Sequence, residues 1–140
     1  ADLVTQYEDD VTKSDLESIM EIGKAVLFPY TTTKPDIVIT AINVDTSYPK
    51  GGRVAWSRRD NKGSFTTGPA KNSDVFVPTE LRHDGTFLVK VETSLDYVPM
   101  VTWFIGDSVG TTEGGVSLIE MSERYFMRPR LGSDIDCTDC

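Results

Sequence analysis

The first clear alternation of apolar and polar positions predicts an amphipathic helix near the N-terminus. Ser14 is followed three residues later by Glu17, which is the capping-box signature of a helix start. Apolar residues then recur at helical spacing on one face, namely Leu16, Ile19, Met20, Gly23, Val26 and Leu27. Pro29 ends the pattern because proline cannot continue a helix. We expect a helix of about three to four turns with its apolar stripe in the core and Gly23 allowing close approach.

Two β-branched stretches then predict a hairpin. Residues 36–45 (DIVITAINVD) are apolar on both faces, which is typical of a central strand covered on both sides. Turn residues at 48–52 separate this stretch from 53–59 (RVAWSRR), in which Val54 and Trp56 alternate inward. We therefore expect the two stretches to pair.

The second half of the chain predicts two more strands. Residues 75–82 contain a proline and favour a single helical turn, whereas 86–93 (TFLVKVET) alternate as a half-buried strand. Residues 116–127 form the last long apolar stretch, and a bulge near 118–119 would reconcile their imperfect alternation. We expect 116–127 to be the last core strand, stopped by Pro129.

Two segments have open interpretations. Residues 60–74 are rich in small polar residues and favour a surface loop, and Arg58 and Arg59 beside it belong to the only basic region of the chain. This region is either solvated or a docking surface for an acidic neighbour. Trp103 and Phe104 lie in an apolar run that is either core or an exposed interaction patch. These four residues are our candidate interaction surface.

Composition limits the class of protein. The 140 residues suit one globular domain, and the net charge of −8 disfavours binding to nucleic acid or anionic lipid. That charge fits a basic or cation-rich partner. No apolar run approaches the roughly 18–20 residues that span a bilayer, and no signal peptide is present. The chain begins without Met, which is typical of a processed or trimmed chain.

Cys137 and Cys140 are the only cysteines, and their spacing allows a disulfide, half a zinc site or a redox pair. Zinc needs about four ligands, and the chain has a single histidine besides these cysteines. A redox pair needs a stabilised thiolate, which the surrounding acidic residues oppose, namely Asp134, Asp136 and Asp139. The residues favour a structural disulfide in an oxidising compartment, with a small stabilisation because its loop is short.

Other candidate chemistry is weak. His83 sits beside Asp84, but no nucleophile motif accompanies it. The two Gly-Gly pairs lack the spacing of phosphate-binding loops. The acidic tail lacks the Gly and Glu of an EF-hand calcium loop. We expect no catalytic residue, no cofactor and no metal site.

Residues 86–140 resemble the TadE/TadF-like minor pseudopilins of the tight-adherence (Flp) pilus system. The resemblance rests on DGTFLVKVETSLDYVP, a Gly-rich loop, and a final strand ending in ERYFMRPRLGSDIDC. Its most specific part is YFMRPR followed closely by Cys. The hairpin and the helix are also similar, so the resemblance covers nearly the whole chain. Leu95 departs from it, because members often carry an aromatic pair before the proline and only Tyr97 remains here.

The resemblance implies an α+β, pilin-like single domain over residues 1–140. In such a domain the N-terminal amphipathic helix packs on an antiparallel sheet of about four strands, and residues 1–13 end a helix that continues from an upstream membrane segment. The implied role is non-enzymatic priming or capping of the pilus, and hence surface attachment. Implied partners are other minor pilins, the major pilin and the inner-membrane assembly platform. The implied location is the periplasmic side of the inner membrane, or the pilus outside the cell.

A competing hypothesis is a free periplasmic or secreted binding domain. It would be a calcium-dependent adhesin using Trp103 and Phe104 or the acidic tail. This hypothesis predicts a melting temperature that rises in millimolar calcium, because a ligand that binds only the folded state stabilises it.

Overall fold

The computed structural model describes residues 1–7, 10–27, 33–97, 112–113, 116–117 and 119–140. Its helices are α1 (Asp2–Thr5), α2 (Lys13–Leu27) and the 3-10 turn η1 (Thr79–Leu81). Its strands are β1 (Asp36–Val44), β2 (Gly51–Asn61), β3 (Ser64–Thr66), β4 (Asp74–Phe76), β5 (Phe87–Tyr97), β6 (Thr112–Glu113), β7 (Val116–Ser117) and β8 (Ile119–Met127).

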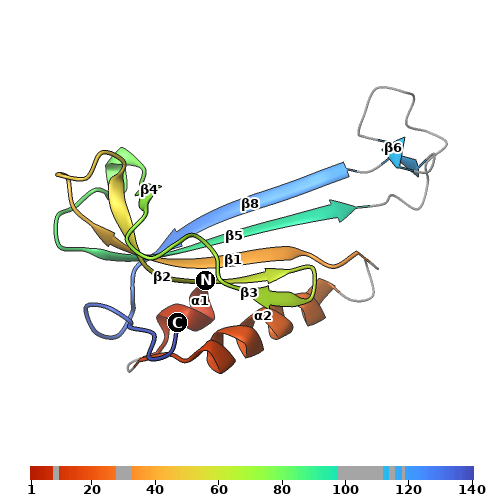
Figure 1. Cartoon of the computed structure of the whole chain (residues 1–140), viewed down its shortest axis with the longest axis horizontal. Helices are drawn as coiled ribbons and strands as arrows, with labels where there is room; N and C mark the ends of the chain where they lie inside the picture. Colours follow the sequence, from red (N-terminus) through yellow and green to blue (C-terminus); the bar gives the residue numbers. More distant parts are fainter. Residues whose placement is uncertain (8–9, 28–32, 98–111, 114–115, 118) are drawn as a thin grey trace.

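One antiparallel sheet organises the described part of the chain. Its strand order is β3-β2-β1-β5-β8, and β4 pairs with β2 beside β3. Among the described residues, strands β6 and β7 pair only with each other. Helices α1 and α2 lie on one side of the sheet, below β1, β2 and β3 (Figure 1). The helices therefore do not extend under β8, which forms the far edge.

The expectation of a pilin-like domain, with an N-terminal amphipathic helix on an antiparallel sheet of about four strands, is wrong. The described structure is mainly a six-stranded antiparallel sheet, and its longest helix has 15 residues. Of residues 1–13, Asp2–Thr5 form a short separate helix and Lys13 begins α2, while Val11 makes a β-bridge to Cys137. The sheet is larger than expected because the polar segment 60–74 extends β2 and adds β3 instead of forming only a loop.

Helix α2 is where the apolar pattern predicts it, and Leu16 and Met20 of its stripe are buried, but Val26 is 73% exposed and not in the core. The cap of the helix also differs from the prediction. The capping box joins Thr12 and Asp15, not Ser14 and Glu17. The Thr12 N–H donates to Asp15 Oδ2 at 2.9 Å, and the Asp15 N–H donates back to Thr12 Oγ1 at 3.2 Å. Glu17 is instead used in an ion pair with Arg58.

Gly23 is not required for close packing. It is exposed, and a Cβ at this position would lie 3.9 Å from Ile37 Cδ1, which is an ordinary contact. The expectation that its small size admits a neighbouring element is wrong.

The core has one cluster on each face of the sheet. The cluster on the helix side joins α1, α2, the sheet and the C-terminal tail, and its buried members are Val4, Val11, Leu16, Met20, Ile37, Ile39, Ala41, Trp56, Phe87, Val89 and Ile135. The cluster on the other side is Ile42, Val44, Val54, Val75, Val77 and Leu88. The two clusters confirm that β1 is a central strand covered on both sides.

The predicted hairpin is confirmed by the pairing of β1 with β2, and the strand after residue 86 is confirmed as β5. The helical turn expected within 75–82 is η1. The last strand is not a core strand, because most residues of β8 are exposed and β8 lies at the sheet edge. The bulge expected near 118–119 involves Leu118, which lies outside the described residues.

Candidate interaction surface

Arg58 and Arg59 do not form one basic patch. Adjacent residues of a strand point to opposite faces, so Arg58 faces the helices and Arg59 faces away. The Arg58 Nε–H donates to Glu17 Oε1 at 3.1 Å, and the Arg59 Nε–H donates to Asp36 Oδ1 at 2.9 Å. The hydrogen bond that Arg59 donates to Asp36 and the negative charge of Asp36 raise the pKa of Arg59. Both guanidinium groups are thus used within the chain.

A buried ion pair that the sequence did not suggest joins α2 to β2. Lys24 Nζ lies 2.7 Å from Asp60 Oδ2, and the Asp60 side chain is 0% exposed. The Gly63 N–H donates to the other carboxylate oxygen at 2.7 Å, whereas Oδ2 has the ion pair with Lys24 but accepts no well-aligned hydrogen bond among the described residues. Burial lowers the pKa of Lys24, but the hydrogen bonds and charges of Asp60 and Glu21 outweigh it and raise the pKa. The pair stabilises the position of α2 on the sheet.

Trp103 and Phe104 lie outside the described residues. Their assignment to core or patch therefore stays a prediction.

The C-terminal tail carries the cysteines and packs against the helix layer. Cys137 and Cys140 are joined as a disulfide with Cα atoms 5.4 Å apart. The Trp56 indole N–H donates to the buried Ile135 carbonyl at 2.7 Å, and the Val11 N–H donates to the Asp136 carbonyl at 2.8 Å. These bonds join the tail to β2 and to the segment just before α2.

The acidic residues of the tail do not converge on a cation site. Asp139 Oδ1 accepts the Lys13 N–H at 2.7 Å, and Asp134 accepts the Ser133 hydroxyl. In the described part of the chain the one group with metal-ligand spacing contains Asp139 and the two cysteines, whose sulfurs are already bonded to each other.

His83 and Asp84 are not paired as a base and its orienting acid. His83 is exposed in the turn before β5. The Asp84 carboxylate instead accepts the Thr46 N–H at 2.6 Å and the Thr46 hydroxyl at 3.0 Å. The two residues therefore close a turn.

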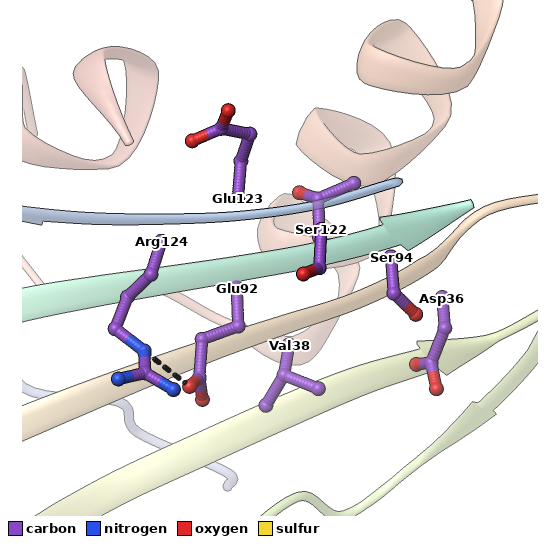
Figure 2. Close-up of a pocket in the computed structure, with 8 residues that line it drawn as sticks. Asp36, Val38, Glu92, Ser94, Ser122, Glu123 and Arg124 are labelled. Atoms are coloured by element: carbon purple, nitrogen blue, oxygen red, sulfur yellow. Dashed lines mark hydrogen bonds and ion pairs between the residues drawn. The ribbon is translucent and has the colours of Figure 1, made fainter. Parts of the chain in front are cut away.

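The polar face of β5 and β8 holds a shallow groove of about 280 Å³. The Arg124 Nε–H donates to Glu92 Oε1 at 2.8 Å, and Lys90 Nζ lies 2.8 Å from the other Glu92 oxygen. Burial raises the pKa of Glu92, but Lys90 and Arg124 outweigh it, so the pKa is lowered. Figure 2 shows Glu123 on the opposite side of the strands from Glu92. The groove lies on an open surface, where Glu92 is paired with both Lys90 and Arg124.

The opposite face of the same strands is more apolar and equally open. Met121 and Tyr125 on β8 are 46% and 60% exposed. Both belong to the helix side, since they face Leu95 and Val91 of β5 in the register. A groove of about 570 Å³ lies here, lined by Thr93, Leu95, Glu120, Met121, Ser122 and Glu123. Strand β8 thus offers an exposed apolar face, a charged face and an edge.

This surface was not predicted, because the apolar residues of 116–127 indicate a core strand. The signal was present in Glu120, Glu123 and Arg124, since three charges in nine residues do not suit a buried strand.

None of the helices in the described residues has both the length and the apolar character needed to cross a bilayer. Comparison of the chain with family models, curated proteins and solved structures finds no match.

Proposed function

We propose that this chain is a non-enzymatic assembly subunit of a tight-adherence (Flp) pilus, a minor pseudopilin that takes part in priming or capping and so in surface attachment. The support from the sequence is the resemblance of residues 86–140, above all YFMRPR followed by Cys. The support from the structure is the open strand β8 with its exposed Met121 and Tyr125. The proposal does not depend on a pilin-like fold.

An open strand suits an assembly role for a physical reason. An edge strand presents unpaired N–H and C=O groups that a partner strand can satisfy, and exposed side chains on alternate positions supply specificity. The partners would be other minor pilins and the major pilin at the inner-membrane platform. A membrane helix upstream would anchor the domain on the periplasmic side, where the Cys137–Cys140 disulfide is chemically stable.

The test is deletion of the gene, with pilus number and surface attachment scored. Wild-type complementation should restore both. Complementation with Met121→Ser and Tyr125→Ser together should fail although the protein is folded and present at normal levels. Phe76→Ser is the matched control, because Phe76 is 57% exposed on β4 and lies away from β8 (Figure 1). Normal piliation and attachment in the deletion strain would overturn the proposal.

A further inference from the structure

Strand β8 is an unusually available edge. It pairs with β5 over nine consecutive positions without a register shift, and no described strand pairs with its other side. Protein edges are commonly blocked by proline, a bulge, a very short strand or charged side chains. Strand β8 has no proline, shows no bulge in its pairing with β5 and spans about 30 Å at the usual rise per residue.

We infer that β8 pairs antiparallel with β8 of a second copy of this chain, about a two-fold axis at Ser122, and joins the two sheets into one. In an antiparallel pair, the N–H and C=O groups of two facing residues either both point toward the partner strand or both point away from it. Neighbouring residues of one strand alternate in this direction, so a residue cannot face the copy of its own neighbour. A two-fold pair of identical strands is therefore centred on a residue and not between two residues.

Charge then selects the centre. With Ser122 facing its own copy, Glu120 faces Arg124 of the second copy, and this opposite-charge pair occurs twice. A centre at Glu120, Glu123 or Arg124 would place like charges directly opposite. Centres at the remaining five positions, Ile119, Met121, Tyr125, Phe126 and Met127, bring no opposite charges together within the strand. The Ser122 centre is thus the one described position at which β8 is complementary to itself.

The neighbouring strand strengthens this match on the charged face. Arg124 already binds Glu92, which also binds Lys90. Adding Glu120 of the second copy gives a row of two cations and two anions that crosses from β5 to the second β8. The two Glu123 side chains become diagonal neighbours on the other face, where they oppose pairing more weakly than directly facing charges would.

The apolar face gains contacts in the same register. Ile119 faces Tyr125 of the second copy twice, while Met121 faces Glu123 of the second copy. Aromatic and β-branched residues facing each other are a favourable cross-strand combination. Tyr125, now 60% exposed, would be partly covered.

The experiment uses the purified chain and two single variants, Glu120→Arg and Arg124→Glu, in sedimentation velocity over a concentration series. The wild-type chain should form dimers. Each variant alone should dimerise at least about tenfold more weakly, since tenfold corresponds to roughly 1.4 kcal/mol. A mixture of the two variants should regain dimers, because Arg at position 120 of one chain then faces Glu at position 124 of the other. Because each variant is also measured alone, dimers that return only in the mixture cannot be explained by a change within the fold of either variant.

A second measurement tests the centre directly. Ser122→Cys should be joined to its copy by a short bifunctional maleimide, because facing Cβ atoms lie about 5 Å apart. Leu131→Cys, which is exposed but outside β8, should not be joined. A wild-type chain that stays monomeric to about 1 mM, or dimers that persist in both charge variants, would overturn the inference. The inference does not rest on the pilus assignment. If the deletion strain kept normal pili but the purified chain still formed dimers through β8, the proposed function would fail and the inference would stand.

Discussion

Removing either partner of the buried Lys24–Asp60 pair should destabilise the protein, but by unequal amounts. The Asp60 side chain is fully buried, whereas Lys24 is 16% exposed and has Glu21 at 2.5 Å as a second partner. In Lys24→Met the carboxylate keeps only the Gly63 N–H, and an uncompensated buried charge costs about 3–5 kcal/mol. In Asp60→Asn the amide oxygen can still accept from Gly63, and the ammonium keeps Glu21. That loss should be about 1.5–3 kcal/mol, the value of a hydrogen bond to a charged group.

The assay is urea unfolding at pH 7, followed by tryptophan fluorescence, for both single variants and the double variant. The double variant should cost less than the sum of the singles by about 0.5–3 kcal/mol, which is the usual coupling of contacting residues. Lys71→Met, at an exposed lysine, is the control and should change stability by less than about 0.5 kcal/mol. The reasoning fails if Lys24→Met costs less than Asp60→Asn, or if the two losses simply add.

Three further outcomes follow from the helix and the tail. Gly23→Ala should raise the free energy of unfolding by about 0.5–1 kcal/mol, because alanine restricts the unfolded chain and meets no clash; a lower melting temperature would contradict this. The pKa of Asp15 is lowered by hydrogen bonds from Thr12, so its stabilisation is present above the ordinary value of 3.8 and is lost as the pH falls through the lowered pKa. The stability difference between wild type and Asp15→Asn should therefore shrink on acidification, and a difference that grows would refute the assignment. Replacing Cys137 and Cys140 by Ser should cost about 2 kcal/mol or less, because the loop is short. Intact mass after alkylation should show blocked thiols in the native protein only once it has been reduced.

Local patterns identified the elements whose side chains repeat with one period. The helix at α2, the hairpin of β1 and β2, and strand β5 were all predicted because their apolar residues recur with helical or strand spacing. The cap of α2 was misplaced because two S/T-x-x-D/E patterns overlap there. The choice between them depends on Arg58, which is distant in sequence and pairs with Glu17.

The candidate interaction surface was predicted less well, for a related reason. Arg58 and Arg59 are close in sequence and basic, but a strand sends them to opposite faces, where each finds an acidic partner. Strand β8 was assigned to the core from its apolar residues, although nothing local to it shows whether a helix lies above it. Helix α2 packs on β2 and leaves β8 uncovered, as Figure 1 shows.

The sequence by itself determined the order and type of the main elements and the close spacing of Cys137 and Cys140, whereas the resemblance to a pilus family stays a prediction. These depend on residues within a few positions of each other, where spacing and chemistry suffice. Tertiary structure alone decided the size of the sheet, the burial of Asp60 against Lys24 and the exposure of β8. Those properties depend on which distant segments lie together, and packing between distant segments leaves no periodic signal in the chain.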